Sequence, residues 1–285
     1  MQRPRAPLSL HRSLGVFMSA YRLALVPLAL SFGCVEAELE FAGLDQATLG
    51  NAASLDSDGD GISDEDEVAI GTDPESDDSD LDGWTDGEEL ERNTDPTDGS
   101  DKPYEGGWPI GDCRNDVEAD SSLSQGGIAP DFALMDSFGD TVRLHDFCHM
   151  AVLVVTGAEW CGPCQAYRTD MAQHYDAYFS RGLMVIDFLG ETASGGEPTA
   201  EDLVRWADGH PYAVLADPGW SVSNSGYVSG GIPAMSLLGP GAEVLTLNAG
   251  GPSGAQIEEA LPVGFELPAY MSEDGSDDDH DGHDH

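Results

Sequence analysis

The chain has 285 residues, of which 54 are acidic and 11 are Lys or Arg, and its formal net charge is −43. So few cations cannot displace counterions from phosphate backbones, which excludes a sequence-independent nucleic-acid binder and disfavours adhesion to anionic lipid through a basic patch. About half of the acidic residues lie in two segments, 56–101 and 272–285. We therefore expect a moderately acidic globular body with two acid-rich attachments.

The first predicted element is a secretory signal over residues 1–33. Arginines precede the apolar run Leu23–Phe32, which is too short for a membrane span of about 20 residues. Cys34 follows this run and resembles the cleavage site of a bacterial lipoprotein, which implies that Cys34 is lipidated; the alternative is ordinary cleavage beside a stray cysteine. Because Val35 follows, the resemblance implies an exported, outer-membrane-anchored lipoprotein that faces the periplasm or the cell surface.

An internal repeat follows a predicted tether over residues 34–55. The pattern D-x-D-x-D-G-x5-E occurs twice, and the second copy begins 22 residues after the first. Ca²⁺ takes about six to eight oxygen ligands, which alternate acidic residues supply while the glycine permits a sharp turn. The expected ligands are Asp56, Asp58, Asp60, the carbonyl of Ile62, Asp64 and Glu67 in the first loop, and Asp78, Asp80, Asp82, the carbonyl of Trp84, Asp86 and Glu89 in the second.

The spacing of the repeat excludes a paired EF-hand. Only ten residues separate Glu67 from Asp78, so we expect one short helix after each loop, ending at Gly71 and Asn93. Over residues 56–101 the chain resembles bacterial thrombospondin type 3 repeats, which implies a structural role for Ca²⁺ in a spacer. The alternative is a disordered acidic linker, the state also expected without calcium because so few apolar residues cannot offset chain entropy.

Residues 102–270 are predicted to form one α/β domain. The expected strands are a hairpin over 129–134 and 141–144, then 151–155, 183–189, 212–215, 234–238 and an edge strand over 243–247. The expected helices run from 161 to about 181, 200–208, 220–227 and 253–261.

The sequence Trp160-Cys161-Gly162-Pro163-Cys164 follows a buried strand, and Ile232-Pro233 lies 69 residues beyond Cys164. These features resemble the thioredoxin superfamily, and the helix–strand insertion between 189 and 218 is similar to its TlpA-like periplasmic branch. The resemblance implies a three-layer α/β/α fold with a mixed central sheet, thiol–disulfide oxidoreductase activity and no organic cofactor.

The resemblance and the helix-start position together assign roles around the dithiol. Cys161 is expected to be the exposed nucleophile, because free N–H groups at a helix start stabilise a thiolate, and Cys164 is expected to resolve the mixed disulfide. Trp160 is expected to shield the pair, and Pro233 to be cis and to face it. Val155 stands where the family carries a buried acid.

Two nearby acids are candidate replacements for the acid missing at Val155. Glu159 is expected to lie too near the surface, and Glu191 is a weak candidate. A peroxiredoxin is disfavoured because Ala158 stands where that family has threonine three residues before the reactive cysteine.

Two further cysteines, Cys113 and Cys148, are expected to form a structural disulfide in an oxidising compartment, the alternative being two buried thiols. The tail, residues 271–285, mixes Asp with His; it is predicted to be a disordered terminus, the alternative being loose metal binding.

The predicted function is reduction or exchange of disulfides in exported proteins. The expected partners are those disulfide-containing proteins and a membrane-linked electron donor, with the membrane contacted only through the lipid anchor and no nucleic acid bound. The alternative is a non-enzymatic, calcium-binding surface lipoprotein that uses the thioredoxin fold as a binding module, which the missing acid at Val155 favours.

Overall fold

The computed structural model describes residues 55–271, all within the compact unit of the chain that begins at Ala53. The predicted signal, Cys34, nearly all of the tether and the tail from residue 272 lie outside the described residues. The helices are α1 (Asp64–Ile70), α2 (Asp86–Glu91), α3 (Gly162–Tyr178), α4 (Ala200–Ala207) and α5 (Gly254–Ala260). Within 55–271, no helix combines the length and apolar character that a bilayer crossing requires.

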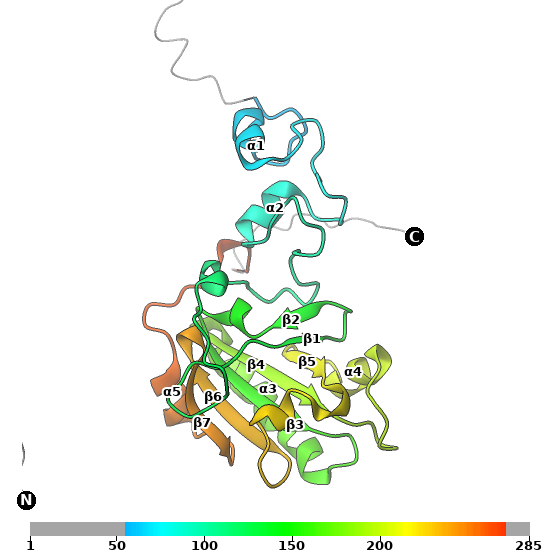
Figure 1. The fold of residues 1–285 in the computed structure, drawn as a ribbon, viewed down its shortest axis with the longest axis vertical. Helices are drawn as coiled ribbons and strands as arrows, with labels where there is room; N and C mark the ends of the chain where they lie inside the picture. The colour runs from blue at the N-terminus through cyan, green and yellow to red at the C-terminus, as the bar shows by residue number, and fades with distance from the viewer. Residues whose placement is uncertain (1–54, 272–285) are drawn as a thin grey trace, which may run out of the picture. The chain divides into compact units, whose positions relative to one another are not determined.

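A five-stranded mixed sheet lies at the centre of the α/β domain, with the strand order β5-β4-β3-β6-β7 (Figure 1). Its strands are β3 (Ala151–Gly157), β4 (Leu183–Leu189), β5 (Ala213–Ala216), β6 (Ala234–Gly239) and β7 (Glu243–Ala249), and a separate hairpin consists of β1 (Ala133–Met135) and β2 (Thr141–Arg143). β3, β4 and β5 are parallel, whereas β6 is antiparallel to both β3 and β7. Every strand of the sheet lies within two residues of its predicted bounds, and the predicted α/β thioredoxin-like fold is confirmed.

The four strands β3 to β6 are buried along their whole length, which is why their residues form nearly continuous apolar runs. Successive side chains of β4 point to opposite faces of the sheet. On one face, the ring of Phe188 packs edge-on against Phe132, 5.0 Å away, and Tyr227, 5.7 Å away. Its neighbour Asp187 therefore points to the other face, towards α3 and α4.

The predicted helix over 220–227 is wrong. The structure has two 3-10 turns there, Pro218–Trp220 and Ser223–Ser225, and left-handed backbone at Gly219 (φ 65°) and Trp220 (φ 56°) interrupts helical geometry. The buried carboxylate of Asp217 accepts hydrogen bonds from the backbone N–H groups of Val222 and Ser223, which fixes the second turn locally.

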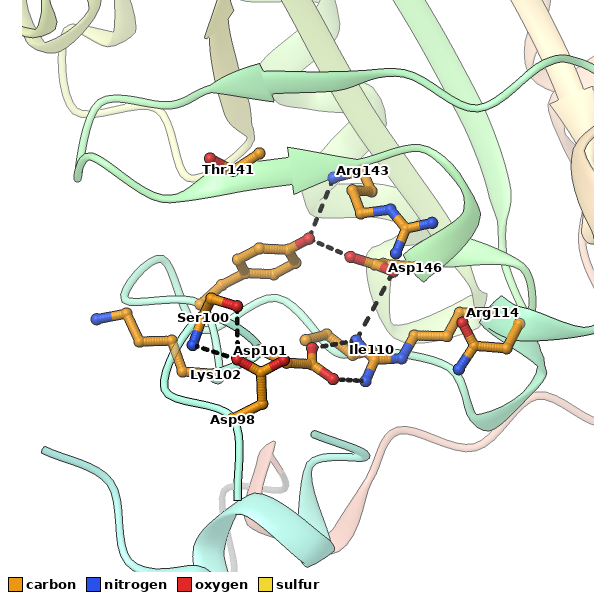
Figure 2. Close-up of a pocket in the computed structure, with 11 residues that line it drawn as sticks. Asp98, Ser100, Asp101, Lys102, Ile110, Arg114, Thr141, Arg143 and Asp146 are labelled. Atoms are coloured by element: carbon orange, nitrogen blue, oxygen red, sulfur yellow. Dashed lines mark hydrogen bonds and ion pairs between the residues drawn. The ribbon is translucent and has the colours of Figure 1, made fainter. Parts of the chain in front are cut away.

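A buried ion-pair network joins the end of the repeat region to the α/β domain (Figure 2). The Arg114 guanidinium donates to both carboxylate oxygens of Asp101, and its Nη1 lies 4.0 Å from Oδ1 of Asp146. The hydroxyl of Tyr104 donates to Oδ2, the other carboxylate oxygen of Asp146. Arg114 thus lies between one carboxylate of the repeat region and one of the domain.

Candidate dithiol site and calcium loops

Cys161 is the N-cap residue of α3, and Gly162 and Pro163 form the first turn. The Sγ of Cys161 accepts a hydrogen bond from the backbone N–H of Cys164 at 3.2 Å, and the two sulfurs form a disulfide. Pro163 loses nothing at this position because its missing N–H would have had no partner inside the helix. After reduction, the same N–H groups face a thiolate at Cys161 and lower its energy.

The bend before β6 lies against this sulfur. The carbonyl oxygen of Ile232 is 3.8 Å from Sγ of Cys161, and the Ile232–Pro233 peptide is cis. Cys161 is only 5% exposed and Cys164 3% exposed, so the expected exposed nucleophile is instead largely covered in this disulfide state, in part by that bend.

The shielding role expected of Trp160 stays a prediction. Trp160 is 53% exposed, and its indole N–H donates to Oε2 of Glu191 at 2.7 Å. The same bond engages Glu191 with the indole rather than with the dithiol.

Glu159 is buried, contrary to the expectation that it lies near the surface. Its carboxylate accepts hydrogen bonds from Arg205, at 3.0 and 2.8 Å, and from the backbone N–H of Ala193 at 2.7 Å. Both of its oxygens are therefore engaged by groups outside the dithiol.

The buried acid that the sequence analysis missed is Asp187. It lies in β4 directly opposite Val155 of β3, and it is 1% exposed. Its Oδ2 accepts a hydrogen bond from the indole N–H of Trp206 at 2.6 Å, whereas its buried Oδ1 has no hydrogen-bond partner in the described residues. Burial raises the pKa of Asp187 to about 7, against the opposing effects of Trp206 and Arg168.

One sequence signal pointed to this residue. Asp187 is the only charged side chain in Leu183–Leu189, a strand buried on both faces. Charged groups are almost never fully buried without a reason, so a single acid in an apolar strand indicates a functional candidate.

The two acidic loops gather the expected carboxylates in the same way. In each loop the first three acidic positions bring one oxygen apiece within 4.8 Å of the others; these residues are Asp56, Asp58 and Asp60, and Asp78, Asp80 and Asp82. Gly61 (φ 99°) and Gly83 (φ 103°) supply the left-handed turns that a side chain would disfavour. α1 and α2 follow the loops as predicted, and Gly71 and Asn93 adopt the left-handed conformation at their ends.

The ninth position of each loop is used differently. Both oxygens of Asp64 accept hydrogen bonds from Ser57, and both oxygens of Asp86 accept them from Ser79. These carboxylates hold the loop closed. Ile62 and Trp84 donate their backbone N–H groups to Asp60 and Asp82, which fixes the turn.

The donor set of the loops fits a hard divalent cation. Several buried carboxylate oxygens have no partner among the described residues: one each of Asp58, Asp82 and Glu89, and both of Glu67 and Asp80. Burial, together with Asp82 and Asp80, raises the pKa of Glu89 to about 8. Buried, unpartnered carboxylates this close together repel one another unless a cation neutralises them, and all-oxygen ligands are those that Ca²⁺ prefers.

Cys113 and Cys148 are joined by a disulfide with a Cα–Cα distance of 6.0 Å. The bond links the segment after the repeats to the turn before β3. A separate pocket is lined by side chains of the repeat end and of the domain, which include Asp98, Lys102 and Arg143 (Figure 2). It does not include the dithiol.

Known protein families match both parts of the chain. Residues 126–230 match the AhpC/TSA family, and residues 56–74 and 78–99 match the bacterial TSP3 repeat. The chain is 28% identical over 142 residues to the thiol-disulfide oxidoreductase ResA of Geobacillus kaustophilus, a match that covers 50% of this chain and 78% of the relative. It is 32% identical over 65 residues to ResA of Bacillus subtilis, covering 23% of this chain and 36% of that one.

Among solved structures, a thiol:disulfide interchange protein of the thioredoxin family from Chlorobium tepidum is similar, with 19% identity and a TM-score of 0.41 over 49% of this chain and 99% of that chain. The chain thus contains a thioredoxin-like domain that matches the AhpC/TSA family and is similar to the ResA thiol–disulfide oxidoreductases, and two segments before it match the bacterial TSP3 repeat.

Proposed function

We propose that this thiol–disulfide oxidoreductase of the thioredoxin fold is exported, is anchored through a lipidated Cys34, and reduces disulfides in exported proteins through Cys161 and Cys164. The observation that carries the proposal is the position of Cys161 at the N-cap of α3, with its sulfur 3.2 Å from the N–H of Cys164 and 3.8 Å from the carbonyl of Ile232.

The reaction follows from this geometry. The Cys161 thiolate attacks one sulfur of a client disulfide, and the other client sulfur leaves as a thiolate. Cys164 then attacks Sγ of Cys161, releases the client in its dithiol form and closes the Cys161–Cys164 disulfide. Two electrons pass to the client, and a membrane-linked electron donor restores the dithiol. The backbone at Ile232, beside Pro233, is placed to hydrogen-bond an extended client chain next to the reacting sulfur.

We further propose that the two loops hold structural Ca²⁺, the first through Asp56, Asp58, Asp60 and Glu67 and the second through the corresponding four positions. The unpartnered oxygens of Glu67 and Asp80 support this assignment. Ca²⁺ supplies the positive charge that lets these carboxylates lie side by side, and the domain carries out its redox chemistry without it.

The test is catalysed reduction of insulin by dithiothreitol, followed by turbidity. The wild-type chain should accelerate precipitation, and Cys161→Ser should reduce the rate to that of dithiothreitol alone. A wild-type rate equal to the uncatalysed rate would instead favour the alternative, a calcium-binding lipoprotein that uses the thioredoxin fold as a binding module.

A further inference from the structure

The family's buried acid is missing at Val155 of β3, but the neighbouring strand β4 carries a buried acid, Asp187, directly opposite that position. β3 and β4 are parallel and in register, with Val155 opposite Asp187 and Gly157 opposite Leu189. Paired residues of adjacent strands point to the same face of a sheet, and so do residues two apart in one strand. The Asp187 side chain therefore shares a face with the side of Gly157 on which Cys164 packs.

Trp206 connects this acid to the resolving cysteine. A methyl group placed on Gly157 would lie 3.6 Å from Sγ of Cys164 and 3.7 Å from Cζ2 of Trp206, so both groups cover the same glycine. The indole N–H, on the same edge of that ring, donates to Oδ2 of Asp187 at 2.6 Å. The same edge of the indole thus lies between the carboxylate and Sγ of Cys164, and among residues 55–271 Oδ1 of Asp187 has no hydrogen-bond partner.

The polar, charged and titratable groups that face Asp187 come from three elements. They are Arg168 of α3, whose guanidinium lies 4.7 Å from the Trp206 ring centre, Trp206 of α4, and Tyr212 just before β5. Nη2 of Arg168 lies 3.8 Å from Oδ2 of the exposed Asp208, and within the described residues Arg168 makes no direct ion pair with Asp187. The buried acid therefore keeps a free oxygen while a nearby cation stabilises its ionised form.

We propose that Asp187 is the proton acceptor for Cys164, serving the resolving step from β4 in place of an acid on β3. This inference rests on the proposed function. In the mixed disulfide, the Cys164 thiol gives its proton to the Asp187 carboxylate through one water. The new thiolate attacks Sγ of Cys161, the bond from Cys161 to the client sulfur breaks with its electron pair on the client, and the client thiolate takes a proton from solvent.

The two steps separate in a stopped-flow reaction of the fully reduced chain with 5,5′-dithiobis(2-nitrobenzoate). Attack by Cys161 releases a first thionitrobenzoate, and resolution by Cys164 releases the second. Asp187→Asn keeps an oxygen that accepts the Trp206 hydrogen bond but cannot take a proton. It should slow the second release at least about tenfold at pH 7, the low end for general-base effects, and leave the first within about twofold.

Trp206→Phe is the matched control, because it removes the hydrogen bond and keeps the acid. If Asp187 served only to hold Trp206, Trp206→Phe would slow the second release and Asp187→Asn would not, and that outcome overturns the proposal. The double variant Val155→Asp/Asp187→Asn moves the acid to the strand position that the family uses, and it should recover much of the second rate.

The wild-type pH profile is an independent measure should Asp187→Asn fail to fold. The rate constant of the second release should change slope with pH near pH 7, while that of the first does not. A second rate constant without that change of slope overturns the proposal. Absence of the first release at any pH would instead contradict the proposed function, so the two failures are distinguishable.

Discussion

At the scale of the single residue, the start of α3 gives two cysteines different reactivity. Cys161 faces the N–H groups of the helix start, whereas Cys164, in the first turn of α3, is buried against Gly157. The start of the helix stabilises the thiolate of Cys161, and Cys164 reacts only after Cys161 has formed a mixed disulfide.

Single serine variants should therefore behave differently with insulin. Cys164→Ser should accumulate a covalent adduct with an insulin chain, because attack occurs and release does not. Cys161→Ser should accumulate none. Non-reducing electrophoresis detects the adduct, and its loss on adding dithiothreitol shows that it is a disulfide. Equal adducts in both variants would contradict this assignment of roles.

The second prediction at this scale concerns stability. The pKa of Asp187 is raised by burial from 3.8 to about 7, so between these pH values the folded state binds a proton that the unfolded state has lost. Stability should fall as pH rises through this window, by up to about 4 kcal/mol for a shift of about three units. Asp187→Asn should remove this loss. In urea unfolding, the free energy of unfolding of the variant should therefore rise relative to that of the wild type from pH 5 to pH 8.

A carboxylate with the opposite shift provides the control. The pKa of Asp202 is lowered to about 2 by the backbone N–H of Thr199, and then by Arg205 and the Thr199 hydroxyl. Its contribution is present above the unfolded pKa and disappears as the pH falls through about 2. Asp202→Asn should therefore cost stability at pH 7 and progressively less in acid. A parallel pH dependence in the two variants would show that Asp187 is not the group responsible.

At the scale of the element, the sequence predicted the strands and the calcium loops well because each carries a local signal. A run such as Leu183–Leu189 is apolar throughout since the sheet buries both faces, and the loops repeat their acids in phase. Two features needed the fold. The pairing of Val155 with Asp187 is a register between strands, and the turns after Asp217 depend on hydrogen bonds that its carboxylate accepts.

The two calcium loops are not independent elements. Oδ2 of Asp60, in the first loop, accepts a hydrogen bond at 2.9 Å from the N–H of Gly87, in the first turn of α2. Asp82 holds the same position in the second loop, and in the described residues its carboxylate hydrogen-bonds only within its own loop, to Trp84.

Asp60→Ala and Asp82→Ala should therefore differ in a calcium titration of the full chain. Asp82→Ala should abolish one site and leave the other near its wild-type affinity. Asp60→Ala should abolish one site and weaken the remaining one several-fold, because α2 loses the acceptor of its Gly87 N–H. Isothermal titration calorimetry measures both, and an unchanged second site in Asp60→Ala would show that the loops bind separately.

At the scale of the whole described chain, the repeats and the domain are connected by specific contacts. The amide of Asn93, at the end of the second repeat, donates to the carbonyl of Ile110 at 2.7 Å. Arg114 pairs with Asp101 and lies near the buried Asp146, and Cys113 beside it is covalently tied to Cys148. These contacts imply that whatever stabilises the second repeat also stabilises the domain.

Calcium should therefore raise the unfolding temperature of the domain, and Arg114→Gln should remove most of that increase. The substitution leaves Arg143 as the remaining cation near the buried carboxylate of Asp146, so it should cost less than the about 3 kcal/mol of a fully broken buried pair, and it disconnects Asp101 from the domain. Calorimetry of each chain with calcium and with a chelator separates the two effects. The effect on Asp146 lowers the unfolding midpoint both with calcium and with chelator. The disconnection of Asp101 reduces only the increase in midpoint that calcium causes.

Arg181→Gln is the matched control, because its ion pair with Glu258 is exposed and neither residue belongs to the repeats. It should change the midpoint little, as exposed pairs contribute at most about 1 kcal/mol, and it should keep the full calcium effect. If Arg114→Gln keeps a calcium effect as large as that of Arg181→Gln, the repeats and the domain unfold independently, and the Asp101–Arg114–Asp146 network is a contact without thermodynamic coupling.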